Sequence, residues 1–112
     1  MVSHHVIMKP RADLSAADRD RLVGAFERAI REIPTVRMVR VGRRVMHGAG
    51  YEAKMPDTAD YFVTIEFDDL AGLTAYLDHP AHQDLGARFN DSLAAGLVFD
   101  FEEVGLDRLR GL

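Results

Sequence analysis

The sequence lacks cysteine, long apolar runs and an excess of basic residues, and each absence narrows what the chain can be. The absence of cysteine favours a cytoplasmic location as the default expectation. No apolar run approaches the roughly 20 residues that a membrane-spanning helix needs, so a membrane protein is not expected. With 18 acidic against 14 basic residues, the net charge of −4 argues against nucleic acid as a partner, because phosphate contacts need a cationic surface.

Length and composition are those of one ordinary globular domain, with 112 residues of which 47% are hydrophobic and 29% charged. Residues 1–6 show neither the basic region nor the apolar region of a secretion signal. We expect a domain over residues 1–104, followed by a tail over residues 105–112 that has no strong pattern and is either mobile or used in contacts between subunits. A chain this small gains from burying more surface through self-association.

Periodic apolar residues predict four strands and three helical segments. The strands are expected over residues 4–9, 36–45, 60–67 and 97–102, and the helices over residues 16–33, 70–79 and 80–93. Ser15 is a predicted cap for the first helix, and Asp68 or Asp69 for the second. Gly42 marks either a bulge or a close approach in the second strand, and residues 46–57 have no period and are expected to form a loop.

The order β-α-β-β-α-β, with a helical extension before the last strand, predicts an α+β fold of the ferredoxin-like type. Such a protomer has a four-stranded antiparallel sheet with its helices on one face. The other face would include His5, Ile7, Phe62 and Thr64, which are too apolar to stand in water over a whole sheet. We therefore expect a homodimer that forms through the open sheet face.

Residues 76–82, Tyr-Leu-Asp-His-Pro-Ala-His, mark a sharp corner between two helices. Pro80 suits the first position of a helix and ends the segment before it. This corner would aim Tyr76 and His82 from neighbouring helices.

Four stretches together resemble the stress-responsive dimeric α/β-barrel family, the Dabb domain. They are His5–Lys9, Tyr61–Asp69, Tyr76–His82 and Val98–Phe101, and the resemblance extends over residues 4–104. The resemblance implies a ferredoxin-like protomer whose sheet pairs with its twin into a barrel. One plant member, olivetolic acid cyclase, closes a linear polyketide into an aromatic ring with a histidine base and a tyrosine.

The resemblance also implies a set of site residues. His82 matches the position of the cyclase's general base, Tyr76 its orienting tyrosine, and His5 a further pocket histidine. The expected ligand-binding residues are Ile7, Phe26, Phe62, His79 and His47. Phe26 stands where the cyclase has another pocket tyrosine, and the loop over residues 46–56 differs from that of the cyclase in sequence and length. The expected ligand is a small apolar or aromatic molecule.

The chemistry of these residue types fits enolisation, because an imidazole takes up protons near neutral pH and a phenol can hydrogen-bond an enolate oxygen. The alternative is that His82 is simply a residue of a first helical turn and Tyr76 an aromatic at the edge of the core. His79 and His82 are three residues apart, but no HExxH motif, acidic cluster or cysteine accompanies them, so no metal is expected.

Two classes of function remain open, with a third less supported. The first is a cofactor-free enzyme of the cyclase, isomerase or lyase type that acts on an enolisable carbonyl compound. The second is a non-catalytic dimer that binds a ligand or serves in a stress response. The third, a cofactor-free oxygenase, is suggested only by other dimeric α/β barrels.

Overall fold

The computed structural model describes residues 1–111, and its elements follow the predicted order. The elements are β1 (Val2–Pro10), α1 (Ala16–Glu32), β2 (Met38–Arg43), η1 (Gly50–Lys54), β3 (Tyr61–Phe67), α2 (Leu70–Asp78), α3 (Pro80–Ser92), β4 (Leu93–Glu102) and η2 (Leu106–Gly111). The two η elements are 3₁₀ helices. All pairings in the sheet are antiparallel, and the strand order is β2-β3-β1-β4. This confirms the predicted ferredoxin-like α+β fold.

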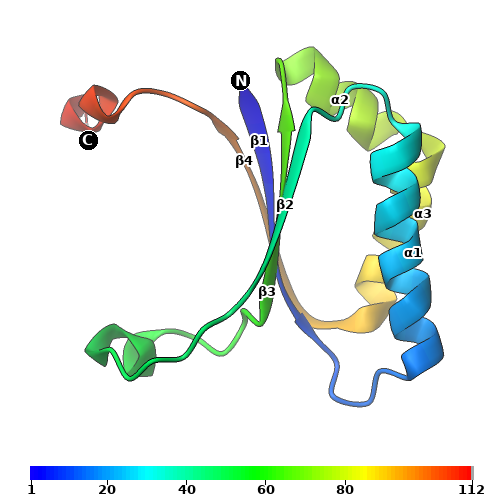
Figure 1. The fold of residues 1–112 in the computed structure, drawn as a ribbon, viewed down its shortest axis with the longest axis vertical. Helices are drawn as coiled ribbons and strands as arrows, with labels where there is room; N and C mark the ends of the chain where they lie inside the picture. Colours follow the sequence, from blue (N-terminus) through cyan, green and yellow to red (C-terminus); the bar gives the residue numbers. More distant parts are fainter. Residues whose placement is uncertain (112) are drawn as a thin grey trace.

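The three α-helices lie on one face of the sheet, and the core fills the space between them (Figure 1). Alternate side chains of the two central strands enter that core, among them Val6 of β1 and Ile65 and Phe67 of β3. Ile65 and Phe67 have no exposed surface, and full burial of such a side chain contributes about 1.5–3 kcal/mol. The predicted alternation of these two strands is therefore confirmed.

Local capping sets where the helices begin. The Ser15 hydroxyl accepts a hydrogen bond from the Asp18 backbone amide at 3.1 Å, and this confirms the predicted cap of α1. Of the two candidates for α2, Asp69 is the cap, because its carboxylate accepts from the Gly72 amide at 2.9 Å. Such caps contribute about 1 kcal/mol each.

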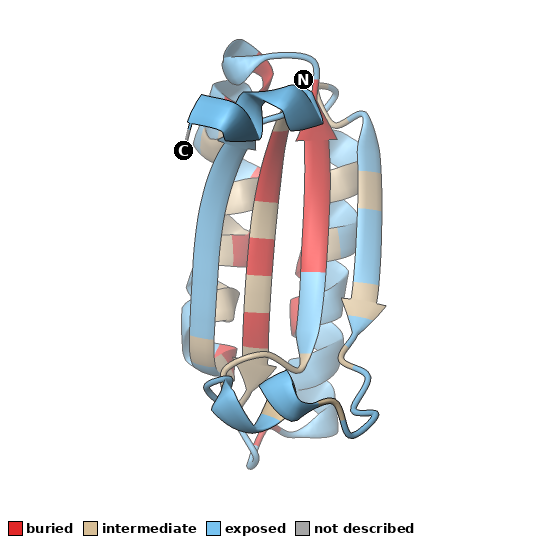
Figure 2. Ribbon diagram, turned by 90° about the vertical axis from the view of Figure 1, so that its left-hand side faces the viewer, coloured by how far each residue is buried: buried red, intermediate tan, exposed pale blue. Residues whose placement is uncertain are grey.

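The opposite face of the sheet is open and carries no helix of the helical layer, and Figure 2 shows that most of β4 is exposed on it. Phe62, Leu97, Phe99 and Phe101 share this face and are each between 42% and 54% exposed. The 3₁₀ helices η1 and η2 both project on this side, at opposite ends of the sheet (Figure 1).

Several bounds differ from the prediction. Strand β1 extends over Val2–Pro10 where residues 4–9 were expected, and β2 is limited to Met38–Arg43 where residues 36–45 were expected. Strand β4 begins at Leu93, four residues earlier than expected, because α3 runs directly into it and Leu93 already pairs with Pro10. The loop after β2 and the tail each contain a short 3₁₀ helix, η1 and η2. Such helices have three residues per turn and leave no 3.6-residue pattern in the sequence.

Gly42 is a point of close approach and not a bulge. The pairing of β2 with β3 is continuous through it, and a Cβ atom at this position would lie 2.0 Å from the ring of Phe62. The absence of a side chain lets the Phe62 ring lie over the backbone of β2.

The packing of α2 predicts that two leucine-to-alanine substitutions in this helix change the free energy of unfolding by very different amounts. Leu73→Ala removes a side chain that is 2% exposed, so we expect a loss of about 2–5 kcal/mol in the free energy of unfolding. Leu70→Ala changes a side chain that is 66% exposed in the same helix, and should alter stability by no more than about 0.5 kcal/mol. Urea unfolding at one fixed protein concentration would measure both, and equal losses would contradict the assigned packing.

Candidate active site

The corner between α2 and α3 is stabilised by residues of the corner itself. The Nδ1 atom of His79 accepts a hydrogen bond from the Ala81 amide at 3.0 Å, and Pro80 occupies the first turn of α3. His79, expected to bind a ligand, therefore caps α3. The corner holds Tyr76 in the last turn of α2 and His82 in the first turn of α3.

Tyr76 and His82 are brought together by this corner, with ring centroids 4.7 Å apart. The Tyr76 ring also lies 5.2 Å from that of Phe67 in the core, and the residue is only 1% exposed. Burial raises the pKa of the Tyr76 phenol to about 12. The phenol is therefore protonated at neutral pH and able to donate a hydrogen bond.

His82 is half-buried, and the pKa of its imidazole is lowered from the usual 6.5. The main cause is desolvation, which disfavours the charged ring, and the nearby His4 adds repulsion. A hydrogen bond to the backbone of Leu77 acts in the opposite direction. The imidazole is therefore neutral at pH 7, the form that can accept a proton.

His4 of β1 completes the cluster from the sheet side. Its ring centroid lies 5.6 Å from that of Tyr76 and 6.4 Å from that of His82. Its Nδ1 atom is 2.6 Å from a carboxylate oxygen of Asp100, directly across the pairing of β1 with β4. Because a carboxylate only accepts hydrogen bonds, Nδ1 carries the proton, and Nε2 is left to accept or hold another.

His5, predicted as the further pocket histidine, does not join this cluster. Its ring nitrogens contact the hydroxyls of Thr64 at 3.1 Å and Ser3 at 2.8 Å, on the open face of the sheet. Sequence reasoning did not select His4 or Asp100. A signal for His4 existed, since strand alternation places residue 4 on the same face as Val6.

The other predicted ligand residues are dispersed. Ile7 and Phe62 are cross-strand partners on the open face. Phe26 of α1 packs partly buried against the core. His47 lies exposed in the loop before η1, where its Nε2 is 3.1 Å from the hydroxyl of Tyr51. Ile7 and Phe62 therefore lie on the sheet face opposite to Tyr76 and His82, and His47 lies in the loop, whereas Phe26 packs against the core cluster that contains Tyr76.

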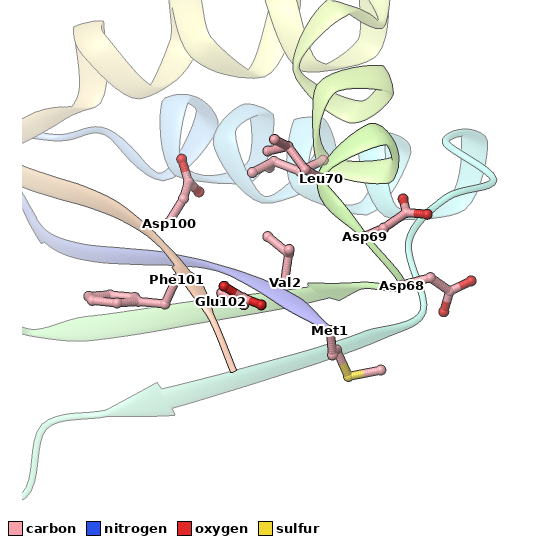
Figure 3. Close-up of a pocket in the computed structure, with 9 residues that line it drawn as sticks. Met1, Val2, Asp68, Asp69, Leu70, Asp100, Phe101 and Glu102 are labelled. Carbon is pink, nitrogen blue, oxygen red and sulfur yellow. The ribbon is translucent and has the colours of Figure 1, made fainter. Parts of the chain in front are cut away.

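A groove of about 470 Å³ adjoins the cluster at Asp100 (Figure 3). Figure 3 shows Val2 and Asp100 on the strand side of this groove and Leu70 on α2 across from them. The complete lining is Met1, Val2, Asp68, Asp69, Leu70, Leu73, Asp100, Phe101 and Glu102. Neither Tyr76 nor His82 lines it, so Asp100 is the link between the groove and the cluster.

The described residues form neither a metal-binding cluster nor a membrane-spanning helix. Among residues 1–111, no three histidine, aspartate or glutamate side chains are grouped closely enough to hold a metal ion. Within the same range, no helix combines the length and apolar character that crossing a membrane requires.

Comparison with known proteins identifies both a family and a fold. A family model described as the stress-responsive A/B barrel domain matches residues 2–103. A crystal structure of an Arabidopsis thaliana protein is similar with a TM-score of 0.77 at 18% identity, covering 95% of this chain and 98% of the other. A hydroxynitrile lyase from Passiflora edulis has a TM-score of 0.76 at 14% identity, with 93% and 95% covered.

A dimeric ferredoxin-like protein of unknown function from Jannaschia sp. has a TM-score of 0.70 at 25% identity, with 91% of this chain and 98% of the other covered. No match to this chain is found among curated proteins.

The surroundings of His82 predict a measurable titration. Its pKa, followed by NMR of the histidine ring protons, should lie below 6.5, and His4→Asn should raise it by removing the repelling imidazole. Asparagine is chosen because its amide can still donate a hydrogen bond to Asp100. The control is His47→Asn in the exposed loop, which should leave the His82 pKa unchanged. A His82 pKa that does not respond to His4→Asn would contradict the coupling of the two rings.

The lowered pKa of His82 also predicts how the free energy of unfolding changes with pH. Because folded His82 binds its proton less well than in the unfolded chain, its contribution to stability is present above pH 6.5. That contribution is lost as the pH falls from 6.5 through the lower pKa of the folded state.

Proposed function

The chain belongs to the stress-responsive A/B barrel domain family, and on that premise we propose that it is a homodimeric small-molecule enzyme acting on an enolisable carbonyl compound. The reaction is of the cyclase, isomerase or lyase type and requires no cofactor. His82 is the base, and Tyr76 is the hydrogen-bond donor.

The observation that carries this proposal is the convergence of Tyr76 and His82, whose ring centroids lie 4.7 Å apart, beside the His4–Asp100 pair. The two groups are in complementary states at neutral pH, a protonated phenol and an unprotonated imidazole. Pairs of titratable groups whose surroundings push their pKa values apart are typical of acid–base sites. The Passiflora edulis lyase supports the proposal to the extent that its fold hosts an enzyme.

In this reaction His82 accepts a proton from the carbon beside the carbonyl group. The Tyr76 hydroxyl donates a hydrogen bond to the oxygen on which negative charge develops, and burial strengthens that interaction. His82 then returns its proton to the product, so the enzyme ends in its starting state. Asp100 holds His4 in one tautomer and one orientation, as a carboxylate does for the histidine of a catalytic triad.

The substrate would approach between β4 and the helices. Val98 of β4 lies on the helix-facing side, as the partner of Val6, yet it is 47% exposed. An apolar side chain this exposed on the core side indicates that the helices do not close over β4. The half-buried His82 is therefore accessible to a small molecule from this edge.

The open sheet face supports the homodimer. Its exposed aromatic residues Phe62, Phe99 and Phe101 form an apolar surface that a second sheet would cover. Three similar structures, from Thermobifida fusca, Bacteroides fragilis and Jannaschia sp., are described as dimeric.

A second candidate function is a non-catalytic dimer that binds a ligand or serves in a stress response. The burial of Tyr76 against Phe67 favours it, because the same side chain contributes to the core. In that case His82 is a residue of a helical first turn without a role in proton transfer.

Proton exchange in D₂O distinguishes the two candidates. With β-keto compounds as substrates, which carry exchangeable hydrogens on the carbon beside the carbonyl group, we expect the protein to accelerate loss of the ¹H NMR signal of those hydrogens. His82→Asn should lower that rate by about 10²–10⁴-fold, and Tyr76→Phe by about 10²–10³-fold. His79→Asn is the matched control, because asparagine also caps helices, and it should leave the rate unchanged.

The second candidate is supported instead if no compound exchanges and His82→Asn mainly lowers the melting temperature. Exchange at equal rates in the native protein and all three variants would remove the proposed roles of Tyr76 and His82.

The assembly is tested by light scattering at micromolar concentration. The native protein should have twice the mass of the 12.5 kDa chain, and Phe99→Asp should shift it towards the monomer by placing a charge in the interface. Val23→Asp is the control, because Val23 of α1 is equally exposed at 50% but lies on the helical side. A native monomer would contradict the proposed dimer.

A further inference from the structure

The tail carries apolar residues that its own chain leaves exposed. Leu106 of η2 is 82% exposed and Leu109 is 54% exposed. A 3₁₀ helix has three residues per turn, so these two leucines lie on the same side of η2. So short a helix is not stable by itself, and an unpacked pair of leucines on it indicates a surface made for a contact.

The same segment carries positive charge beside the leucines. Arg108 and Arg110 flank Leu109, against the single acid Asp107. The surface that receives the tail is therefore expected to combine an apolar floor with an acidic rim.

The groove at Asp100 has these properties. Its apolar lining on the helical side consists of Val2, Leu70 and Leu73, and its acidic lining is Asp68, Asp69, Asp100 and Glu102. Two of these acids already have partners, because Asp68 lies 3.0 Å from Arg37 and Asp100 bonds His4. Within residues 1–111, Asp69 and Glu102 make no ion pair, and Asp69 uses one carboxylate oxygen to cap α2. Glu102 and the second oxygen of Asp69 are therefore the groups that can meet cations from outside.

The tail does not occupy the groove of its own chain. It starts beside the groove, where the Glu103 amide donates to the Met1 carbonyl at 2.9 Å, but then turns to the open side of the sheet (Figure 1). The helices and the groove between α2 and the strands lie on the other side (Figure 3). A second copy placed against the open face lies in the direction that the tail takes.

We propose that the tail of each subunit docks in the groove of its partner in the homodimer. The leucines Leu106 and Leu109 cover the apolar floor, and Arg108 and Arg110 meet Asp69 and Glu102. The docked tail closes the Asp100 end of the site, so each site is complete only with a second copy. This inference rests on the proposed homodimer.

Disulfide trapping tests the contact directly, because the chain has no cysteine of its own. Leu109→Cys and Leu70→Cys variants are mixed, allowed to exchange subunits and oxidised. Leu70 is exposed, so its substitution is compatible with folding. A covalent dimer is expected on non-reducing gels from the mixture and from neither variant alone. A mixture of Leu109→Cys with Val23→Cys on α1 should form none.

Two outcomes would overturn the docking. One is the absence of a covalent dimer in the mixture. The other is a cross-linked monomer formed by the Leu70→Cys/Leu109→Cys double variant, which would show that the tail folds back on its own groove.

Charge reversal supplies an independent measurement. Arg108→Glu with Arg110→Glu should raise the dimer dissociation constant by about tenfold, and adding Glu102→Lys should recover part of that loss. Arg19→Glu with Arg31→Glu makes the same charge change on exposed positions of α1, and should have no effect. If the native protein is a dimer and the arginine substitutions leave its dissociation constant unchanged, the docking is overturned but the dimer is not. If the native protein is a monomer, both are overturned.

Discussion

Successive side chains of β1 leave opposite faces of the sheet, and this alternation places two adjacent histidines in different surroundings. His4 faces the helices, where it meets Asp100 and the ring of Tyr76. His5 faces the open side, where it bonds Ser3 and Thr64. Because β1 is paired on both edges, with β3 and with β4, it cannot slip by one residue without exchanging these two faces. The proposed active site and the proposed dimer interface thus lie on the two sides of one strand.

On the helical side, the corner between α2 and α3 positions the residues of the cluster, as β1 does on the sheet side. His79 and Pro80 determine where one helix ends and the next begins, and their geometry alone brings Tyr76 and His82 within 4.7 Å. The partners on the sheet come from a different part of the chain. The cluster therefore depends on three elements that are remote in sequence. Their packing buries Tyr76 and His82, which is the main cause of both pKa shifts, and it also brings His4 close enough to lower the pKa of His82 further.

Much of the fold could be predicted because its patterns are local. Strand alternation, the Ser15 cap and the proline corner each depend on residues close together in sequence. The start of β4 could not, because Leu93 is recruited into the strand by pairing with Pro10, a contact remote in sequence. Asp100 could not be selected as the partner of His4 for the same reason, since the register of β4 against β1 determines it. The resemblance to a family pointed to His5, while the pleat of the strand brings His4 to the helices.

The junction of α3 with β4 contains no loop, since Ser92 ends the helix and Leu93 begins the strand. His82 is at one end of this continuous unit, and Asp100 lies in its strand part. Because no loop joins α3 to β4, the backbone between His82 and Asp100 has no flexible segment that could adjust to a ligand. A ligand of the proposed site would therefore bind with little loss of conformational entropy at this junction, and the proposed site would favour ligands that fit its existing shape.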